Sequence, residues 1–160
     1  MIDKQERVCY TIQNYTEQWI KTEGIPAMTR RESREQAVCC LYEYEVQPEK
    51  TVAEIAEAAC EQRGQEMSPF ARLIAETAVR NLTEIDEKIA GASDNWRFGR
   101  IGKVSLAILR VAVCELCFLP ERTPEEIAVN EALELARLLD TDKAIPYING
   151  VLAKVIKDRA

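Results

Sequence analysis

The sequence predicts an all-α protein of about seven helices. In segment after segment, apolar residues recur three and four positions apart, which is the spacing of one face of an α-helix. Glycine and proline number only six each, and most of them fall between these segments. No stretch alternates apolar and polar residues as a half-buried strand does. Because a quarter of the chain is Leu, Ile, Val or Phe, a compact core is expected.

The first two predicted helices are separated by a short break. The first covers about residues 4–23, and Gly24 and Pro26 end it. Its apolar stripe consists of Val8, Ile12, Tyr15, Trp19 and Ile20. The second covers about residues 29–46 and ends before Pro48. The stripe marks the first helix as amphipathic, with one face suited to packing on other helices.

Capping signals mark the beginnings of the third and fourth helices. Thr51 and Glu54 have the spacing of a capping box, in which each side chain satisfies a backbone N–H of the other residue. Ser68 followed by Pro69 is an N-cap with proline at the first helical position. From this start the apolar periodicity predicts one long, unbroken helix that ends at Gly91.

Three further helices are predicted in the second half of the chain. After a connector over about residues 95–102, the segment 104–119 is apolar on most of its circumference. A helix of this kind must be surrounded by other helices, so we expect it at the centre of the fold. The remaining two helices cover about residues 124–139 and 144–157.

Composition excludes several classes of function. The chain has no histidine, which removes the commonest general base and metal ligand and every histidine-containing triad. Its net charge of −6 disfavours coating nucleic acid by bulk charge and leaves only a local basic patch for RNA. The longest apolar run, residues 37–42, is far shorter than the roughly 18 residues of a membrane span. With no export signal at the start, a cytoplasmic protein is expected.

The sequence contains no recognisable catalytic motif. Cys114 and Cys117 form a CxxC pair, the spacing that redox and zinc sites use. The other cysteines form no second pair, and this one lies late in an apolar helix, which favours buried thiols. Glycine-rich nucleotide loops are also missing. We therefore expect no enzyme, metal or cofactor, while a redox or zinc protein centred on the CxxC pair remains the alternative.

Three arginines, Arg30, Arg31 and Arg34, fall within five residues of this acidic chain. Arg30 and Arg34 are one helical turn apart, and the guanidinium fork suits phosphate because it donates two hydrogen bonds at once. A strand of RNA could run along this edge. The alternative is an ordinary solvated helix start, with pairs such as Arg31 and Glu35.

A second basic group lies in the connector before the central helix. Arg97, Arg100 and Lys103 alternate there with Trp96 and Phe98. Cations beside aromatic rings suit the stacking of nucleobases. The alternative is that the aromatic side chains anchor the connector in the core and the cations simply face water.

The order of these pieces resembles the bacterial NusB transcription antitermination family. The match covers about residues 28–157, and its specificity comes from several ordered blocks. They are AVCCLY at 37–42, NWRFGRIGKV at 95–104, AILRVAVCEL at 107–116, IAVNEALELAR at 127–137 and YINGVL at 147–152. The chain is thereby divided into an N-terminal extension, residues 1–27, and a NusB-like RNA-binding domain, residues 28–160.

The resemblance implies two small helical bundles and a non-catalytic function. Family members bind the boxA element of nascent ribosomal RNA transcripts with the ribosomal protein NusE, and this complex helps RNA polymerase read through terminators. Carried over, the RNA contacts fall on Arg30, Arg31 and Arg34, and the NusE contacts on Tyr42 and Ser105. A NusB-like interaction module of ribosomal RNA maturation, or a structural homodimer, is the alternative.

Some further positions match the family pattern and others depart from it. Arg110 and Glu115 match internal polar positions and are interpreted as structural, since a charge in a crowded helix must be matched locally. Thr77 stands where the family often has glycine, and Pro146 where another residue is usual. Residues 1–27 have no counterpart, and they form either an added helix that packs on the body or an upstream extension from a misassigned start codon. An intact mass that begins at Met28 or Thr29 would identify the second case.

Overall fold

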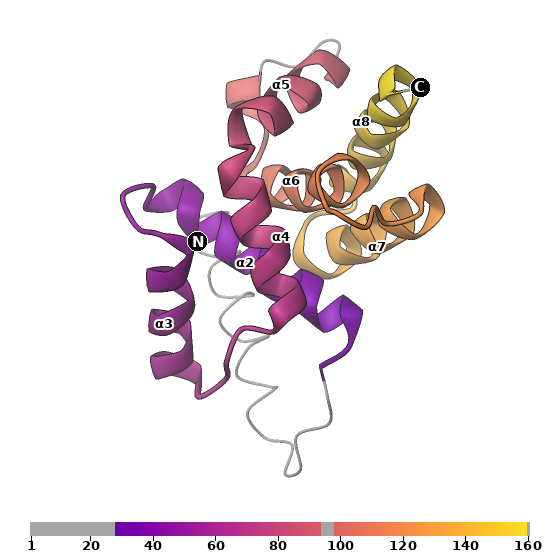
Figure 1. The fold of residues 1–160 in the computed structure, drawn as a ribbon. Helices are drawn as coiled ribbons and strands as arrows, with labels where there is room; N and C mark the ends of the chain where they lie inside the picture. The colour runs from indigo at the N-terminus through magenta and orange to yellow at the C-terminus, as the bar shows by residue number, and fades with distance from the viewer. Residues whose placement is uncertain (1–27, 94–97, 160) are drawn as a thin grey trace.

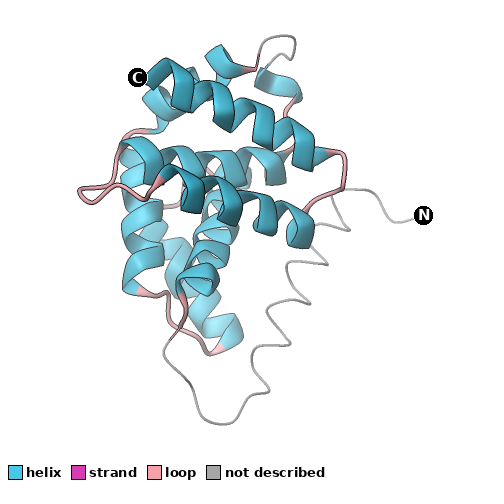
Figure 2. Ribbon diagram, turned by 90° about the vertical axis from the view of Figure 1, so that its right-hand side faces the viewer, coloured by secondary structure: helices cyan, strands magenta, loops and turns pink. Residues whose placement is uncertain are grey.

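The computed structural model describes residues 28–93 and 98–159, so the helix predicted over residues 4–23 lies outside the described part. Within these ranges the chain forms seven α-helices and one short 3-10 helix, with no strand (Figure 2). The α-helices are α2 (Arg30–Val46), α3 (Val52–Arg63), α4 (Pro69–Arg80), α5 (Leu82–Ala92), α6 (Lys103–Cys117), α7 (Glu125–Leu139) and α8 (Ala144–Arg159). The predicted all-α fold is confirmed.

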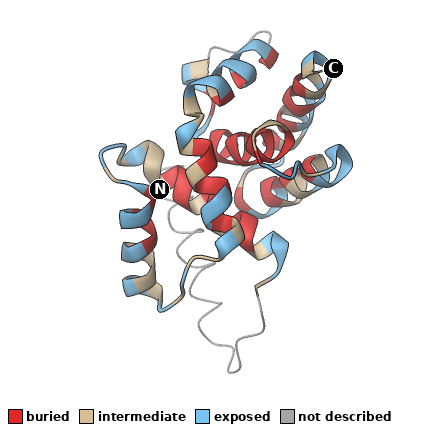
Figure 3. Ribbon diagram, viewed as in Figure 1, coloured by how far each residue is buried: buried red, intermediate tan, exposed pale blue. Residues whose placement is uncertain are grey.

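Helix α6 lies at the centre, as its composition predicts. Every residue from Val104 to Leu116 is buried, so burial runs around the whole circumference (Figure 3). Two groups of helices lie around it: α2 and α4 pack on it from one side, with α3 packed on these two, and α5, α7 and α8 pack on it from the other (Figure 1). Although α6 is strongly apolar, no helix in the described ranges is long and apolar enough to cross a bilayer.

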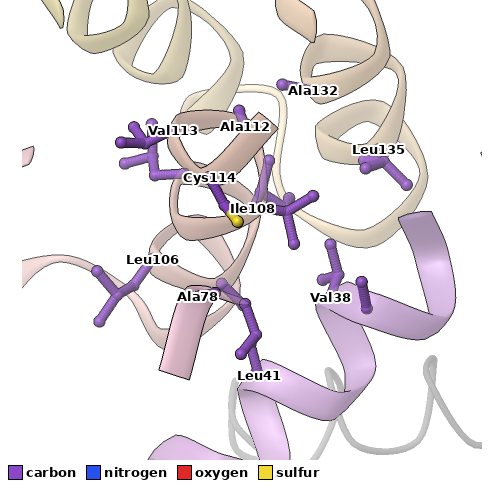
Figure 4. Packing of buried hydrophobic residues seen from close by; sticks show 14 of the residues in the cluster. Val38, Leu41, Ala78, Leu106, Ile108, Ala112, Val113, Cys114, Ala132 and Leu135 are labelled. Carbon is purple, nitrogen blue, oxygen red and sulfur yellow. The ribbon is translucent and has the colours of Figure 1, made fainter. Parts of the chain in front are cut away.

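The core is built from small and branched side chains that converge on α6. Figure 4 shows Val38 and Leu41 of α2 on one side of this helix and Ala132 and Leu135 of α7 on another. The alanines let helix backbones approach closely, and the branched residues fill the space between them. α2 and α7 are thereby fixed against the same helix, and this brings the arginines at the start of α2 near α7.

Local capping fixes where α2 begins. The Thr29 hydroxyl accepts a hydrogen bond from the Glu32 backbone N–H, and the Glu32 carboxylate accepts one from the Thr29 N–H. The capping box predicted at Thr51 and Glu54 is present at the start of α3. α3 ends at Gly64, whose φ of 67° is the left-handed conformation that glycine adopts without steric cost.

The prediction of one long helix ending at Gly91 is wrong, because the chain breaks at Asn81 into α4 and α5. The Asn81 side-chain amide donates to the Thr77 carbonyl at 2.8 Å, and the Asn81 backbone N–H donates to the same oxygen at 3.1 Å. Asparagine competes in this way with regular helical bonding. The break redirects the chain, and α5 packs on α6 and α8.

The final helix begins at Ala144, so Pro146 lies within its first turn. A backbone N–H in the first turn has no acceptor inside the helix, and proline is tolerated there because it lacks one. Pro146 therefore does not delay the start of α8.

Candidate nucleic-acid interface

The three arginines of the predicted RNA site occupy the first two turns of α2, beside the start of α4 and the outer face of α7. Phe70 of α4 lies among them: the Arg30 guanidinium carbon is 3.9 Å from the centroid of its ring, and that of Arg34 is 5.5 Å away. α7 contributes Glu131 to the same region. Although they are close in sequence, the three arginines lie in different surroundings.

Arg34 points into the body of the protein. Its Nε lies 3.0 Å from both carboxylate oxygens of Glu115, and its Nη2 donates to Glu115 Oε1 at 2.8 Å. The Thr123 hydroxyl donates to the same oxygen at 2.8 Å. The exposed fractions of the Arg34 and Glu115 side chains are 7% and 1%. Arg34 therefore holds α2 against the end of α6, and its guanidinium is not presented to a ligand.

Arg31 lies at the surface in a similar pairing. Its Nε and Nη2 donate to the two oxygens of Glu131, both at 2.9 Å, and about half of its side chain is exposed. These hydrogen bonds raise the pKa of Arg31 and lower the pKa of Glu131. Glu35, the partner that the alternative interpretation proposed, is buried. The Arg31 guanidinium is accessible, but a carboxylate already occupies its fork.

Arg30 is the most available of the three. It is exposed, and among the described residues no carboxylate forms an ion pair with it. Its guanidinium is stacked on Phe70 instead, a cation–π contact that leaves the charge uncancelled. The stack also restricts the side chain, so less conformational entropy is lost when a ligand binds.

The polar positions of α6 are structural, as predicted. Arg110 donates to both carboxylate oxygens of Asp86 at 2.8 Å and to Glu45 at 2.6 Å. Burial alone lowers the pKa of Arg110, but the hydrogen bonds that it donates to Asp86 and Glu45 outweigh this effect and the pKa is raised. The interior charges Arg110 and Glu115 are thus each matched by partners from other helices.

The model of the NusB family matches residues 31–157. This chain belongs to the NusB family. It is 36% identical over 131 residues to the transcription antitermination protein NusB of Exiguobacterium sp., covering 82% of this chain and 99% of that protein. It is 38% identical over 136 residues to the corresponding protein of Oleidesulfovibrio alaskensis, covering 81% of this chain and 88% of the relative.

Solved NusB structures share the fold. A crystal structure of the antitermination factors NusB and NusE in complex with dsRNA superposes with a TM-score of 0.71 at 26% identity, over 81% of this chain and 96% of that one. NusB of T. maritima gives a TM-score of 0.70 at 25% identity, over 81% and 92% of the two chains. The two-bundle arrangement around α6 is therefore that of the NusB family.

The two positions that the NusB resemblance implies for NusE contacts lie inside this fold. Tyr42 and Ser105 are 3% and 7% exposed. The Ser105 hydroxyl donates to a carboxylate oxygen of Asp140, which directly follows α7. A partner on this NusB-like body would meet the surface around these residues more than their own side chains.

The structure describes only part of the second basic group, the connector before α6. Phe98 packs against the core and Ile101 is buried, which agrees with the anchoring interpretation, while Arg100 and Lys103 face water. Trp96 and Arg97 lie outside the described residues. Lys103 begins α6, and Glu115 follows about 18 Å further along the helix axis. The two basic groups of this NusB-like domain thus lie at opposite ends of α6.

The CxxC pair does not have the surroundings of a redox site. Cys114 is fully buried, its thiol is 3.5 Å from the Ile74 carbonyl oxygen, and burial raises its pKa to about 12. Cys117 is half-buried. Within residues 28–93 and 98–159 no group of three or more Cys, Asp or Glu side chains is arranged to hold a metal ion. Cys114 therefore lies in the core, as predicted.

Two residues of the arginine site were missed by sequence reasoning. Phe70 is one of the apolar residues at the start of a helix, a pattern that indicates core, and nothing nearby predicts an arginine stacked on it. Glu131 lies 100 residues from Arg31 and reads as part of a solvated acidic face. No local sequence signal pairs either residue with the start of α2; the packing of the assembled fold brings them there.

Proposed function

We propose that this chain is a non-catalytic, RNA-binding transcription antitermination factor that binds the boxA element of nascent ribosomal RNA transcripts together with NusE, in the cytoplasm. The observation that carries the proposal is the exposed pair Arg30 and Arg31 on an otherwise acidic protein. The similarity to NusB proteins, and to a NusB that was solved with NusE and dsRNA, supports it.

In this proposal the two exposed arginines contact phosphates and the third positions them. Arg30 is held on Phe70 with its charge uncancelled, so it takes the first phosphate. Arg31 takes a second phosphate when its fork exchanges the Glu131 carboxylate for a phosphate oxygen. Arg34 anchors the first turns of α2 to α6 through Glu115 and keeps the other two arginines at this edge.

The charge balance favours an RNA complex that needs a partner. Three arginines and two glutamates leave residues 29–35 a net charge of +1, so the remainder of the chain carries −7. A patch this small supports few phosphate contacts, and each contact contributes only part of the electrostatic affinity. NusE would add the missing contacts, and the acidic remainder would limit binding to unrelated RNA.

For NusE we propose a contact surface around Tyr42 and Ser105. Both residues are buried beneath this surface, and Ser105 holds the Asp140 carboxylate where α7 ends. Ser105→Ala should therefore weaken NusE binding by releasing Asp140, and Asp140→Asn should reproduce the loss. The RNA polymerase antitermination complex would be reached through NusE and the RNA together.

A structural homodimer is the second candidate, because α7 carries two exposed apolar side chains. Ile127 and Leu138 are 48% and 38% exposed and lie about three helical turns apart on one side of the helix. Sizing the free protein and then its RNA complex separates the candidates. A dimer that persists in the RNA complex and is lost in Ile127→Glu would favour the structural homodimer.

The central test is a titration of labelled boxA RNA and of a scrambled RNA, each with and without NusE. We expect boxA to bind more tightly than the scrambled RNA, and NusE to widen the difference. Equal affinities for the two RNAs, both with and without NusE, would overturn the proposal.

Variants of single arginines test whether boxA RNA binds at the start of α2. Arg30→Ala should weaken boxA binding and reduce its salt dependence, because one phosphate contact is lost. Arg80→Ala is the matched control: it removes one exposed helical arginine at the far end of α4. If both variants lose the same affinity, the RNA contacts lie elsewhere on the surface.

A further inference from the structure

A groove separates α2 from α3 on the side of α2 that faces away from the central helix. Its volume is about 310 Å³. Its walls include Met28, Cys39 and Tyr42 on the α2 side, and Ile55, Ala59 and Met67 from α3 and the segment that follows it. The arginines proposed to contact RNA, Arg30 and Arg31, do not line this groove, whereas Tyr42 also belongs to the surface proposed for NusE.

Helix α3 leaves part of its apolar side uncovered. Only Val52, Ile55 and Ala56 of this helix are buried, all in its first half, whereas Ala58 and Ala59 remain half-exposed and line the groove (Figure 3). Charged and amide side chains, among them Glu43 and Lys50, lie around the apolar surface. An apolar floor with a polar rim suits an amphipathic helix.

The chain enters its described part at this groove. Met28 lines it, and Thr29 caps α2 directly afterwards. The segment before Met28 is therefore bonded directly to a residue of the groove wall. The Exiguobacterium relative is covered over 99% of its length by 82% of this chain, and the family match begins at residue 31, so the preceding segment is additional to that relative.

We propose that residues 4–23 form an amphipathic helix that docks its apolar stripe into this groove within the same chain. A helix of 20 residues is about 30 Å long and α2 about 26 Å, so one can run the length of the other. Only residues 24–29, which include Gly24 and Pro26, would connect this helix to α2, and short connections make neighbouring helices antiparallel. The stripe, centred on Ile12, Tyr15 and Trp19, then covers α3 and the surface beside Tyr42.

In this arrangement a segment of the same chain covers the groove next to Tyr42, which is proposed to lie under the NusE contact surface. It does not depend on RNA or NusE, and its test uses neither. Failure of the groove proposal and failure of the proposed function are therefore distinguishable.

The first test uses Trp19 fluorescence in the full-length chain carrying Trp96→Phe, which leaves a single tryptophan. Docked, Trp19 emits at short wavelength and acrylamide quenches it weakly. Ala59→Arg fills the groove and should shift the emission to longer wavelength with a severalfold rise in quenching. Ala53→Arg, at an exposed position of the same helix outside the groove, should leave both unchanged. Strong quenching of Trp19 in the parent chain, or no response to Ala59→Arg, would overturn the proposal.

The second test changes the segment and not the groove, so it does not depend on how α3 tolerates arginine. Ile12→Asp places a charge on the stripe and should speed alkylation of Cys39, which lies in the groove wall. Asn14→Asp, on the opposite helical face, should not. Equal alkylation rates in both variants would contradict docking.

Crosslinking identifies which chain fills the groove. A short amine-to-carboxylate crosslinker should join Lys21 or Lys4 to groove acids such as Glu43, and mixing light and heavy isotope-labelled protein should give links within one chain. Links that form only between light and heavy chains would instead assign the groove to a second copy and overturn the proposal.

Discussion

Arg31 and Arg34 lie three residues apart on the same helix, and both grip a glutamate with Nε and Nη2, yet about half of one side chain and only 7% of the other is exposed. The exposed pair reaches α7 and the buried pair reaches α6. The same hydrogen-bond chemistry therefore serves two purposes. Out of water, the Arg34–Glu115 pair is costly to break, whereas water can replace either partner of the Arg31–Glu131 pair.

This difference explains how one short arginine-rich segment can both fasten a helix and offer a binding edge. A buried guanidinium needs a full set of acceptors, which Glu115 supplies with help from Thr123 and which fix its orientation. A surface guanidinium can exchange its carboxylate for a phosphate at little cost. Burial, and not residue type, decides which of these guanidinium groups is accessible to a ligand.

The largest effect is expected from Arg34→Ala. It leaves the Glu115 carboxylate buried without its counter-ion, and breaking such a pair costs about 3–5 kcal/mol of folding free energy. Urea unfolding followed by circular dichroism measures the change. Arg31→Ala, the matched surface variant, should keep the unfolding midpoint of the parent chain. If both variants lose the same stability, the buried and the exposed ion pair do not differ in what they contribute to folding.

Replacing both buried partners should cost much less. In the double variant Arg34→Met, Glu115→Met neither member of the pair is left buried without its partner, and apolar substitutes for buried ion pairs are often neutral or stabilising. The same urea experiment should therefore find the double variant more stable than Arg34→Ala alone. A double variant as unstable as that single one would show that the pair itself, and not an orphaned charge, stabilises the fold.

At the surface, Arg30→Ala should weaken boxA binding more than Arg31→Ala does. Arg30 keeps its full charge over Phe70, whereas Glu131 cancels part of the charge of Arg31. Losing one phosphate contact should also flatten the slope of log K against log salt by about 0.7 for a single strand. Titrations at four salt concentrations measure both quantities. A steeper loss in Arg31→Ala would reverse the assigned order of the two arginines.

Glu131→Gln should strengthen RNA binding, because it removes the carboxylate that competes with phosphate for the Arg31 fork. We expect a gain of about two- to fivefold, in line with the small energies of exposed ion pairs. Glu134→Gln, an acid on the same helix that pairs with Arg137, is the control for net charge. A gain of the same size in both variants would point to bulk charge alone.

The smallest effect concerns pH. The hydrogen bond from Arg31 lowers the pKa of Glu131 below its ordinary value of 4.5, so its contribution to stability is present above that value and is lost as pH falls through the lower, folded-state pKa. The contribution of the Glu131 carboxylate to stability is measured by comparing the acid unfolding of the parent chain with that of Glu131→Gln. If the stabilities of the two proteins fall in parallel as the pH drops below 4.5, the ionised Glu131 carboxylate does not contribute to stability.

Signals close together in the sequence predicted most of the fold. The cap at Thr51, the Ser68–Pro69 start and the apolar circumference of α6 each act within one or two helical turns, and each element appears where they place it. Asn81 shows the limit of such signals, because the apolar stripe continues across it while its side chain ends the regular helix.

The arginine site was predictable only in part. The guanidinium chemistry was visible at Arg30, Arg31 and Arg34, but the burial of Arg34 depends on Glu115, 81 residues further along the chain. The family resemblance implied that Glu115 occupies an internal, structural position, without naming its partner. Which arginine turns inward is decided by how α2 packs on α6, a property of the assembled fold.

The separation of Arg34 from Glu115 has a consequence for the newly made chain. At about 5–20 residues per second, the ribosome needs about 4–16 s after adding Arg34 to reach Glu115, 81 residues later. During that interval α2 has neither its counter-ion nor the central helix that buries it. The part of the core that α2 shares with α6 can therefore form only after α6 has left the exit tunnel.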